Sequence, residues 1–430
     1  MLTPEERKEL KEKRTAMNRK NNIKLYPLYK SFGYDTWFYF AISVSYYLRK
    51  GLTSSEIMLK AAFFSLFSIL FQPIANLCTE KFGKRNTIII GNIIVLISII
   101  VLILSKSFGM VIVFVLLNAL GFDMKYIAES NLLYDSFAEG PHKREAYAKT
   151  EQKGYTAYCV FQALSSIAAG FLFNVHEDLP MYCALIVTVI ATLISFSFVE
   201  VLPLDKKPLA ETRKYFRVLF RKYKKINKSN RLRALLLITG IGFGLMYISE
   251  GYELQLFDKI AVNPTIVGIL YAVMIAMRGI GAKVANFMNK KFKNRTLTHI
   301  LQSYTINFFL GGIIALIPIP LEIKIVLLGL LYAFYSIHEG AQHVLERRYL
   351  FSFSNDSVES SISSIKSITD NLVRMTMSFI ASGVLLIVEI RYAFLIMGVI
   401  AIILILVGTS YGKNRLGLEP EEYTKKDIYE

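Results

Sequence analysis

Residues 76–85 read Asn76-Leu77-Cys78-Thr79-Glu80-Lys81-Phe82-Gly83-Lys84-Arg85 and connect two long apolar runs, residues 55–79 and 86–104. As helices that rise about 1.5 Å per residue, both runs can cross the roughly 30 Å hydrocarbon layer of a bilayer. The connecting segment is short and basic, and it places the Glu80 carboxylate at a helix end. We expect a turn between two antiparallel membrane helices, which either latches a gate or only directs the topology of the chain.

The same apolar pattern continues in both directions from this turn. Hydrophobic residues make up 53% of the 430 residues and charged residues only 19%. We expect an all-α membrane protein with about twelve spans, at roughly 25–48, 55–79, 86–104, 109–134, 150–173, 180–201, 234–255, 265–288, 296–317, 323–346, 361–388 and 392–411. No remaining segment is long enough for a separate catalytic domain, so a soluble enzyme is excluded.

The net charge of +17 is explained by topology. Most of the 50 Lys and Arg residues fall in the termini and in alternate loops, whereas the opposite loops hold few, namely Arg49, Lys50, Lys106, Lys259, Lys324 and Arg391. The positive-inside rule then places both termini in the cytoplasm of a cell whose plasma membrane holds the protein. We expect no nucleic-acid partner and no cleaved signal peptide, and the basic segment before residue 233 could also touch anionic lipid.

An internal repeat divides the chain. At an offset of 210 residues, Ala75-Asn76 aligns with Ala285-Asn286, and the same register places Glu129 on Glu339. A duplicated six-span unit explains these matches together and predicts two related bundles. We therefore expect an N-terminal tail at 1–24, a first bundle at 25–201, a linker at 202–233, a second bundle at 234–411 and a C-terminal tail at 412–430.

Residues 76–85 resemble the loop between the second and third helices of the major facilitator superfamily. Glu80 stands at its acidic position, Gly83 at its tight turn, and Lys81, Lys84 and Arg85 at its basic positions. The second copy retains Asn289, Lys290 and Arg295 but has Lys293 where the turn glycine would be. The resemblance implies two pseudo-symmetric six-helix bundles, alternating access, a cytoplasmic gate at these loops and a monomeric functional unit.

Ionisable residues inside the spans are costly unless they are paired or face a cavity. In the superfamily, the first and fourth helices of each repeat line the cavity. The intramembrane charges concentrate on spans 1, 4, 7, 8, 10 and 11, and they are Asp35, Asp123, Lys125, Glu129, Glu250, Glu253, Arg278, Glu339, Lys366, Asp370 and Arg374. Their positions therefore indicate a polar interior.

Four of the polar residues are candidates for proton coupling: Glu129, Glu339, Asp35 and His338. Lys125 and Glu129 are four residues apart on one helix face, so we expect them to pair until a proton on Glu129 releases Lys125. His338 precedes Glu339 and could relay a proton. A permanently ionised structural pair and a histidine that only packs remain the alternatives.

The candidates for the substrate cavity are Lys125, Arg278, Asp370, Arg374, Lys366, Gln342, Tyr252 and Glu253. Lys366, Asp370 and Arg374 follow one another at intervals of four residues and form a ladder on one helix face. That ladder could hold a carboxylate or phosphate of the substrate, or it could clamp the bundle.

The transported solute is not specified by these patterns. Residues 65–73 resemble the lactose-permease group of sugar and nucleoside symporters, but Glu151 stands where that group carries an arginine. The kink motif of drug antiporters is also absent from residues 165–170. We expect a proton-coupled secondary transporter of a small polar organic solute, with import favoured over export. An efflux antiporter and a non-transporting sensor are the alternatives, and no cofactor, metal or enzymatic activity is expected.

Overall fold

The computed structural model describes residues 4–138, 140, 142–201, 221, 229–352, 359–413 and 415–416, and within these ranges the regular structure is helical, with no strand. Most of the predicted linker 202–233 and residues 417–430 of the predicted C-terminal tail lie outside the described residues. The chain forms two compact units: Met1–Phe40 with Leu70–Thr212, and Ala41–Ile69 with Arg213–Glu430.

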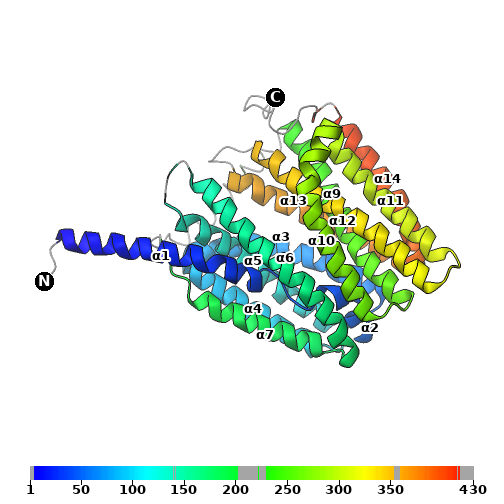
Figure 1. The fold of residues 1–430 in the computed structure, drawn as a ribbon, viewed down its shortest axis with the longest axis horizontal. Coiled ribbons are helices and arrows are strands. Elements are labelled where there is room, and N and C mark those ends of the chain that lie inside the picture. Colours follow the sequence, from blue (N-terminus) through cyan, green and yellow to red (C-terminus); the bar gives the residue numbers. More distant parts are fainter. Residues whose placement is uncertain are drawn as a thin grey trace. The chain divides into compact units, whose positions relative to one another are not determined.

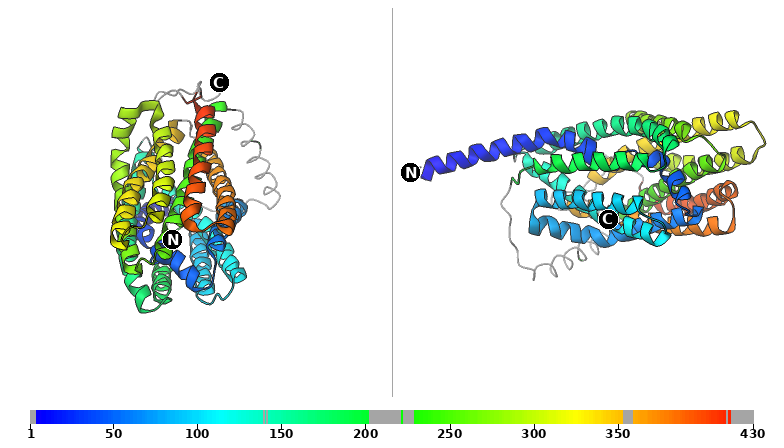
Figure 2. Two further views of the ribbon diagram at one scale, coloured as in Figure 1. Left: turned by 90° about the vertical axis from the view of Figure 1, so that its right-hand side faces the viewer. Right: turned by 90° about the horizontal axis from the view of Figure 1, so that it is seen from below.

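The first unit is built from α1 (Pro4–Gly33), the later part of α3 (Ser54–Phe82), α4 (Lys84–Ile103), α5 (Phe108–Ser136), α6 (Lys143–Val175) and α7 (Leu179–Phe196) (Figure 1). α4 and α5 approach closely at Gly91 and Gly121, where a Cβ on either glycine would lie 2.8 Å from the carbonyl oxygen of the other. The first turns of α1 extend beyond the ends of α4, α5 and α7 (Figures 1 and 2).

The second unit holds α2 (Ser43–Arg49), the first part of α3, and the helices of the second half of the chain: α9 (Asn230–Lys259), α10 (Pro264–Phe292), α11 (Thr296–Leu316), α12 (Leu321–Ser352), α13 (Glu359–Ile387) and α14 (Ile390–Gly412). A short 3-10 turn, η2 (Lys293–Arg295), joins α10 to α11. Of the apolar helices described, α9 is the most buried, and it packs mainly against α13 and α14.

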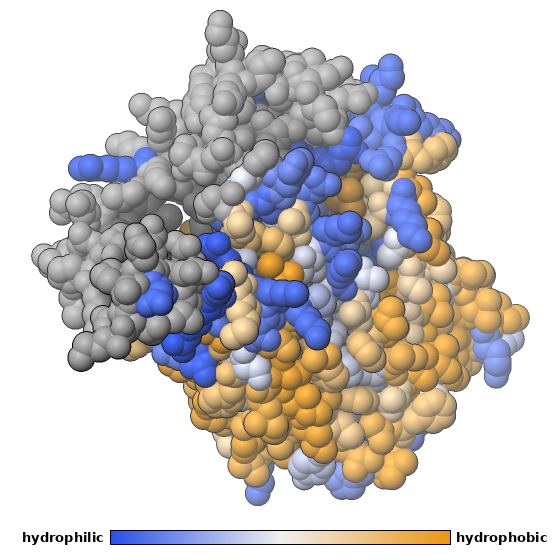
Figure 3. All heavy atoms as spheres, turned by 60° about the vertical axis from the view of Figure 1, so that its left-hand side comes forward, coloured by the Kyte–Doolittle hydropathy of each residue, from blue (hydrophilic) through white to orange (hydrophobic). Residues whose placement is uncertain are grey.

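Membrane-spanning helices are confirmed by length and composition. Within the described residues, eleven helices are long and apolar enough to cross a bilayer, and the predicted first span, at residues 25–48, is not among them. Many large apolar side chains on these helices are exposed, such as Val175 at 77% and Ile387 at 85%. On the face drawn in Figure 3, hydrophobic residues cover a broad area while hydrophilic residues gather toward one end. Exposed apolar area of this extent fits contact with lipid.

The first predicted span, 25–48, is not one helix. α1 ends at Gly33, and helical structure resumes only at η1 (Phe40–Ile42) and α2. In the gap, the Trp37 indole donates to the carbonyl of Ser31 over 3.0 Å and Phe38 has φ of 59°. The prediction of a continuous helix was wrong here because a side-chain hydrogen bond and a left-handed residue end the helix without a proline or a run of polar residues.

Two other helices differ from straight, uninterrupted spans. α7 ends at Phe196, five residues before the predicted end of its span at 201. Asn22 fixes the segment that follows α7 by donating to the Val199 carbonyl over 2.8 Å. α3 contains Pro73 in its interior. A proline cannot donate the helical hydrogen bond to the carbonyl four residues earlier, which is that of Ile69, the last residue of its segment in the second unit.

Candidate functional site

A buried ion pair lies at the centre of the first unit, between Lys30 of α1 and Glu129 of α5. The side chains are 4% and 0% exposed, and Lys30 Nζ also lies 4.4 Å from the centroid of the Tyr34 ring. α6 can come close because Gly154 faces Lys30, where a Cβ would lie 2.8 Å from the lysine side chain. Each of these two opposite buried charges compensates the other, so removing one would leave its partner uncompensated.

Lys125 does not form the predicted ion pair with Glu129. Its Nζ donates instead to the carbonyl of Gly33, the last residue of α1, over 2.6 Å. A helix end leaves carbonyl groups without intrahelical donors, so the early end of α1 supplies an acceptor that a continuous helix would lack. Lys30 was missed from the sequence because it lies toward the predicted edge of its span. Asp35 lies in the gap after α1, where its Oδ1 accepts from the backbone of Thr36 over 2.9 Å.

In the second unit, the side chain of Arg278 contacts two carboxylates. Arg278 Nε of α10 donates to Glu339 Oε2 of α12 over 2.6 Å, and Arg278 Nη2 lies 3.5 Å from Glu250 Oε1 of α9. Tyr271 donates to the same Glu250 carboxylate. One guanidinium therefore joins three helices through two carboxylates. His338 projects from a different side of α12, where its ring contacts Phe334.

Glu253 is held in a different way. It is 1% exposed, and its Oε1 accepts from Ser249 Oγ and from Asn307 Nδ2, each over 2.8 Å. Among the described residues no basic group forms an ion pair with it, and its Oε2 has no hydrogen-bond partner. Ser249 and Asn307 are uncharged, so a search for intramembrane charges could not find them. Tyr252, another predicted cavity residue, donates to the Ala381 carbonyl over 3.0 Å and thereby joins α9 to α13.

A line of hydrogen bonds connects α11, α12 and α13. Tyr304 donates to Gln342 Oε1 over 2.5 Å, and Gln342 Nε2 donates to Glu346 Oε1 over 2.6 Å. Lys366 then bridges Glu346 at 3.2 Å and Asp370 at 2.6 Å. Glu346 is also buried. It was not predicted as a site residue, because it lies at the last position of a predicted span and was interpreted as the start of a charged loop.

Arg374 completes the predicted ladder on α13 but has different surroundings. Its guanidinium carbon lies 3.7 Å from the centroid of the Tyr247 ring and 5.1 Å from that of Phe64. Lys60 on α3 lies 4.2 Å from the centroid of the Tyr47 ring. All five of these residues belong to the second unit. Sequence reasoning did not single out Lys60, which lies near one end of its span.

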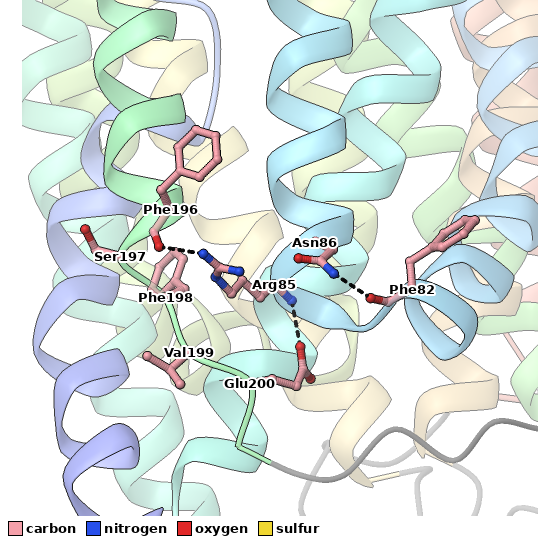
Figure 4. Close-up of a pocket in the computed structure, with 8 residues that line it drawn as sticks. All are labelled: Phe82, Arg85, Asn86, Phe196, Ser197, Phe198, Val199 and Glu200. Carbon is pink, nitrogen blue, oxygen red and sulfur yellow. Dashed lines mark hydrogen bonds between the residues drawn. The ribbon is translucent and has the colours of Figure 1, made fainter. Parts of the chain in front are cut away.

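The turn between α3 and α4 has the backbone that its glycine predicts, with Gly83 at φ 86°. Lys84 pairs with Asp135 of α5, and Arg85 donates from its backbone to Glu200 and from Nη2 to the Phe196 carbonyl, both over 3.0 Å. These contacts border a pocket of about 420 Å³ lined by residues 82, 85, 86 and 196–200 (Figure 4). Glu80 and Lys81 are exposed to solvent.

The second copy of the turn keeps the unusual backbone without the glycine. Lys293 takes φ of 50°, so it occupies the same left-handed half of conformational space as Gly83. Asn289 is buried at 4% exposure, whereas Lys290 and Arg295 are exposed. The two turns are therefore alike in position and in the sign of φ.

Eleven apolar helices in the described part of the chain, with polar clusters buried among them, are typical of a multi-pass membrane transporter. The sequence profile of the Major Facilitator Superfamily matches residues 28–342. The chain belongs to this superfamily, and the family and the solved structures it resembles are transporters rather than enzymes. No curated protein matches the chain by sequence.

Solved structures share the fold at low sequence identity. The nucleoside transporter NupG is 11% identical, with a TM-score of 0.70 over 92% of this chain and 99% of that one. An autoinhibited peptide transporter of the POT family is 13% identical, with a TM-score of 0.67 over 97% and 99%. A bacterial homologue of the human lysosomal transporter Spinster is 15% identical, with a TM-score of 0.65 over 96% and 99%.

Proposed function

We propose that the protein is a proton-coupled secondary transporter of a small polar organic solute that works by alternating access. We place it in the plasma membrane with both termini in the cytoplasm, as a monomeric functional unit that favours import. Membership of the superfamily and the solved nucleoside and peptide transporters of the same fold support transport. The asymmetric distribution of Lys and Arg supports the orientation.

One observation supports the proposed coupling of transport to protons. Glu129 and Glu339, which align in the internal repeat, are both buried and both bound to a basic residue of another helix, Lys30 and Arg278 respectively. A proton added to either carboxylate would remove the charge that holds its partner. The released cation would then favour a different helix arrangement or bind the solute, so protonation and conformation would be linked.

Transport in reconstituted vesicles tests this proposal. A thermal-shift screen against sugars, nucleosides, amino acids, peptides and drugs first identifies a solute, and uptake is then measured with and without an imposed proton gradient. Glu129→Gln and Glu339→Gln should each abolish acceleration by the gradient. Glu322→Gln makes the same change at an exposed position of α12 and should leave the acceleration intact.

Three results would contradict the proposal or part of it. If both buried variants still respond to the proton gradient, the carboxylates do not carry the coupling. If a solute stabilises the protein but vesicles show neither uptake nor exchange, the protein is a sensor. Outward movement of solute coupled to inward protons would indicate the efflux antiporter instead.

A further inference from the structure

The buried Glu253 carboxylate lies on a stretch of α9 where negative charge exceeds positive charge. Glu250, one turn earlier on α9, and Glu339 on α12 both contact Arg278, at 3.5 and 2.6 Å. These four charged groups are three carboxylates and one guanidinium, and the guanidinium is engaged by the two carboxylates other than Glu253. A buried charge without a counter-charge is costly, so the Glu253 carboxylate needs a cation or a proton.

Neutral side chains position one oxygen of the Glu253 carboxylate. Ser249 Oγ and Asn307 Nδ2 both donate to Glu253 Oε1 over 2.8 Å, and Asn307 Nδ2 also donates to Ser249 Oγ over 2.7 Å. These bonds fix the orientation of the Asn307 amide, because turning it over would point its carbonyl oxygen at the carboxylate. Glu253 Oε2 and Asn307 Oδ1 are left as acceptors, and neither has a hydrogen-bond partner in the described part of the chain.

The hydroxyl of Tyr332 on α12 belongs to the same region. The Tyr332 ring packs edge-to-face against Phe257, one turn after Glu253 on α9, with 5.5 Å between the ring centroids. Its hydroxyl oxygen lies 3.5 Å from the position that a Cβ on Gly311 would take, and Gly311 lies one turn after Asn307 on α11. The Tyr332 hydroxyl is therefore enclosed by the same two helices that hold Glu253 and Asn307.

Four buried oxygen atoms on these three helices have no hydrogen-bond partner among the described residues: Glu253 Oε2, Asn307 Oδ1, the Tyr332 hydroxyl and Ser336 Oγ. Ser336 follows Tyr332 by one turn of α12 and is equally buried. Buried polar atoms are nearly always satisfied, so a group of such atoms indicates a bound ion or water. Oxygen atoms are the ligands that hard cations prefer, and the single negative charge matches a monovalent ion.

We infer that this cluster binds a monovalent alkali cation, of which Na⁺ is the type, between Glu253 and Asn307 and beside the hydroxyl groups of Tyr332 and Ser336. The cation would neutralise the Glu253 carboxylate and join α9, α11 and α12, so its binding would stabilise one arrangement of these helices. The inference goes beyond the proposed function, because it adds an ion other than the proton.

Thermal unfolding of the purified full-length protein tests this site without any need for flux. The protein is prepared in choline chloride, and lithium, sodium or potassium chloride then replaces the choline salt at constant ionic strength and constant, mildly alkaline pH. At least one alkali cation should raise the unfolding temperature in a saturable manner. Choline is too large to enter the cluster, so it serves as the reference for effects of ionic strength.

Variants locate the effect. Glu253→Gln should abolish the response to the alkali cation, because the amide carries no charge. Asn307→Leu removes an oxygen ligand at nearly constant size and should weaken the apparent affinity at least tenfold. Glu322→Gln makes the carboxylate-to-amide change at an exposed position of α12 and should keep the full response. If Glu253→Gln does not fold, Glu253→Asp, which keeps the charge on a shorter side chain, should still show at least tenfold weaker binding.

The inference is overturned if no alkali cation stabilises the protein more than choline does, or if Glu253→Gln responds to the cation as the original protein does. Stabilisation by a lower pH without any response to alkali cations would show that Glu253 takes a proton, and it would overturn the inference as well. These outcomes are independent of the proton-coupling test. A cation response that needs Glu253, together with gradient-insensitive flux, would reject the proposed proton coupling and leave this site standing.

Discussion

Arg278 Nε binds Glu339 Oε2 over 2.6 Å at the place where α10 and α12 come closest, because a Cβ added to Gly340 would overlap the carbonyl of Arg278 itself. The ion pair and the close helix crossing are thus one feature. The short backbone separation lets the Arg278 side chain reach the buried Glu339 carboxylate, and the ion pair in turn holds the crossing together.

Removing one partner of this pair should cost more than removing both. Arg278→Gln leaves the Glu339 carboxylate buried without its cation, and we expect it to destabilise the protein by about 3–5 kcal/mol. Adding Glu339→Gln should recover most of that loss, because two neutral amides can hydrogen bond. Thermal unfolding of the purified single and double variants measures both effects. Equal stability of the single and double variants would refute the coupling.

The glycines at the same crossing should tolerate no side chain. A Cβ at Gly281 would overlap the carbonyl of Ile337, as one at Gly340 would overlap that of Arg278. Gly281→Ala and Gly340→Ala should therefore destabilise the protein by about 1–3 kcal/mol through forced separation of α10 and α12. Gly279 lies on α10 with open space where a methyl group would point, since no atom comes within 4 Å of that position, so Gly279→Ala is the matched control. Unfolding temperatures that do not separate these variants would contradict the packing described.

The ion pair of the first unit should behave in the same manner. Lys30→Gln should destabilise the protein by about 3–5 kcal/mol, because Glu129 loses the cation that compensates its charge, and Glu129→Gln in the same chain should restore stability. Lys125→Gln should cost less, about 1–3 kcal/mol, since it removes a hydrogen bond to the end of α1 and a contact with the Phe122 ring but leaves Glu129 its partner Lys30. A Lys125 variant less stable than the Lys30 variant would show that Lys125 is the true partner of Glu129.

The two turns of the repeat offer a reciprocal prediction. Gly83 has φ of 86° and ψ of 161°, a region that residues with a Cβ rarely occupy, so Gly83→Ala should cost about 1–3 kcal/mol. Lys293 has φ of 50° and ψ of −132°, so Lys293→Gly should relieve strain and raise the unfolding temperature. Gly51 has φ of 87° with open space where a Cβ would point. Gly51→Ala therefore measures the cost of backbone strain without the cost of steric crowding. A neutral Gly83→Ala would show that the turn can adopt another backbone.

Hydropathy and the positions of charged residues were enough to predict the number of crossings and the fold. Long apolar runs have only one way to satisfy their backbone groups in a bilayer, which is to form helices. The internal repeat and the turn at residues 76–85 allowed the superfamily to be predicted as well. These features depend on local composition, and so they can be read without knowledge of which helices touch.

Partners of the buried charges could not be predicted in the same way. The sequence placed Lys125 beside Glu129 on one helix, but the cation that meets Glu129 comes from α1, whose early end also gives Lys125 a different acceptor. Ser249 and Asn307 carry no charge, and Lys60 and Glu346 lie at the margins of spans. Which groups meet depends on helix rotation and on where helices end, and these are set by packing between distant segments.

The proline inside α3 has a mechanical consequence. The carbonyl that Pro73 leaves without a helical donor belongs to Ile69, and the chain passes from one compact unit to the other between Ile69 and Leu70. A helix bends most readily where a hydrogen bond of its ladder is absent. The chain therefore passes from one unit to the other where one hydrogen bond of the α3 ladder is absent, and we expect any bend of this helix to be confined to that point.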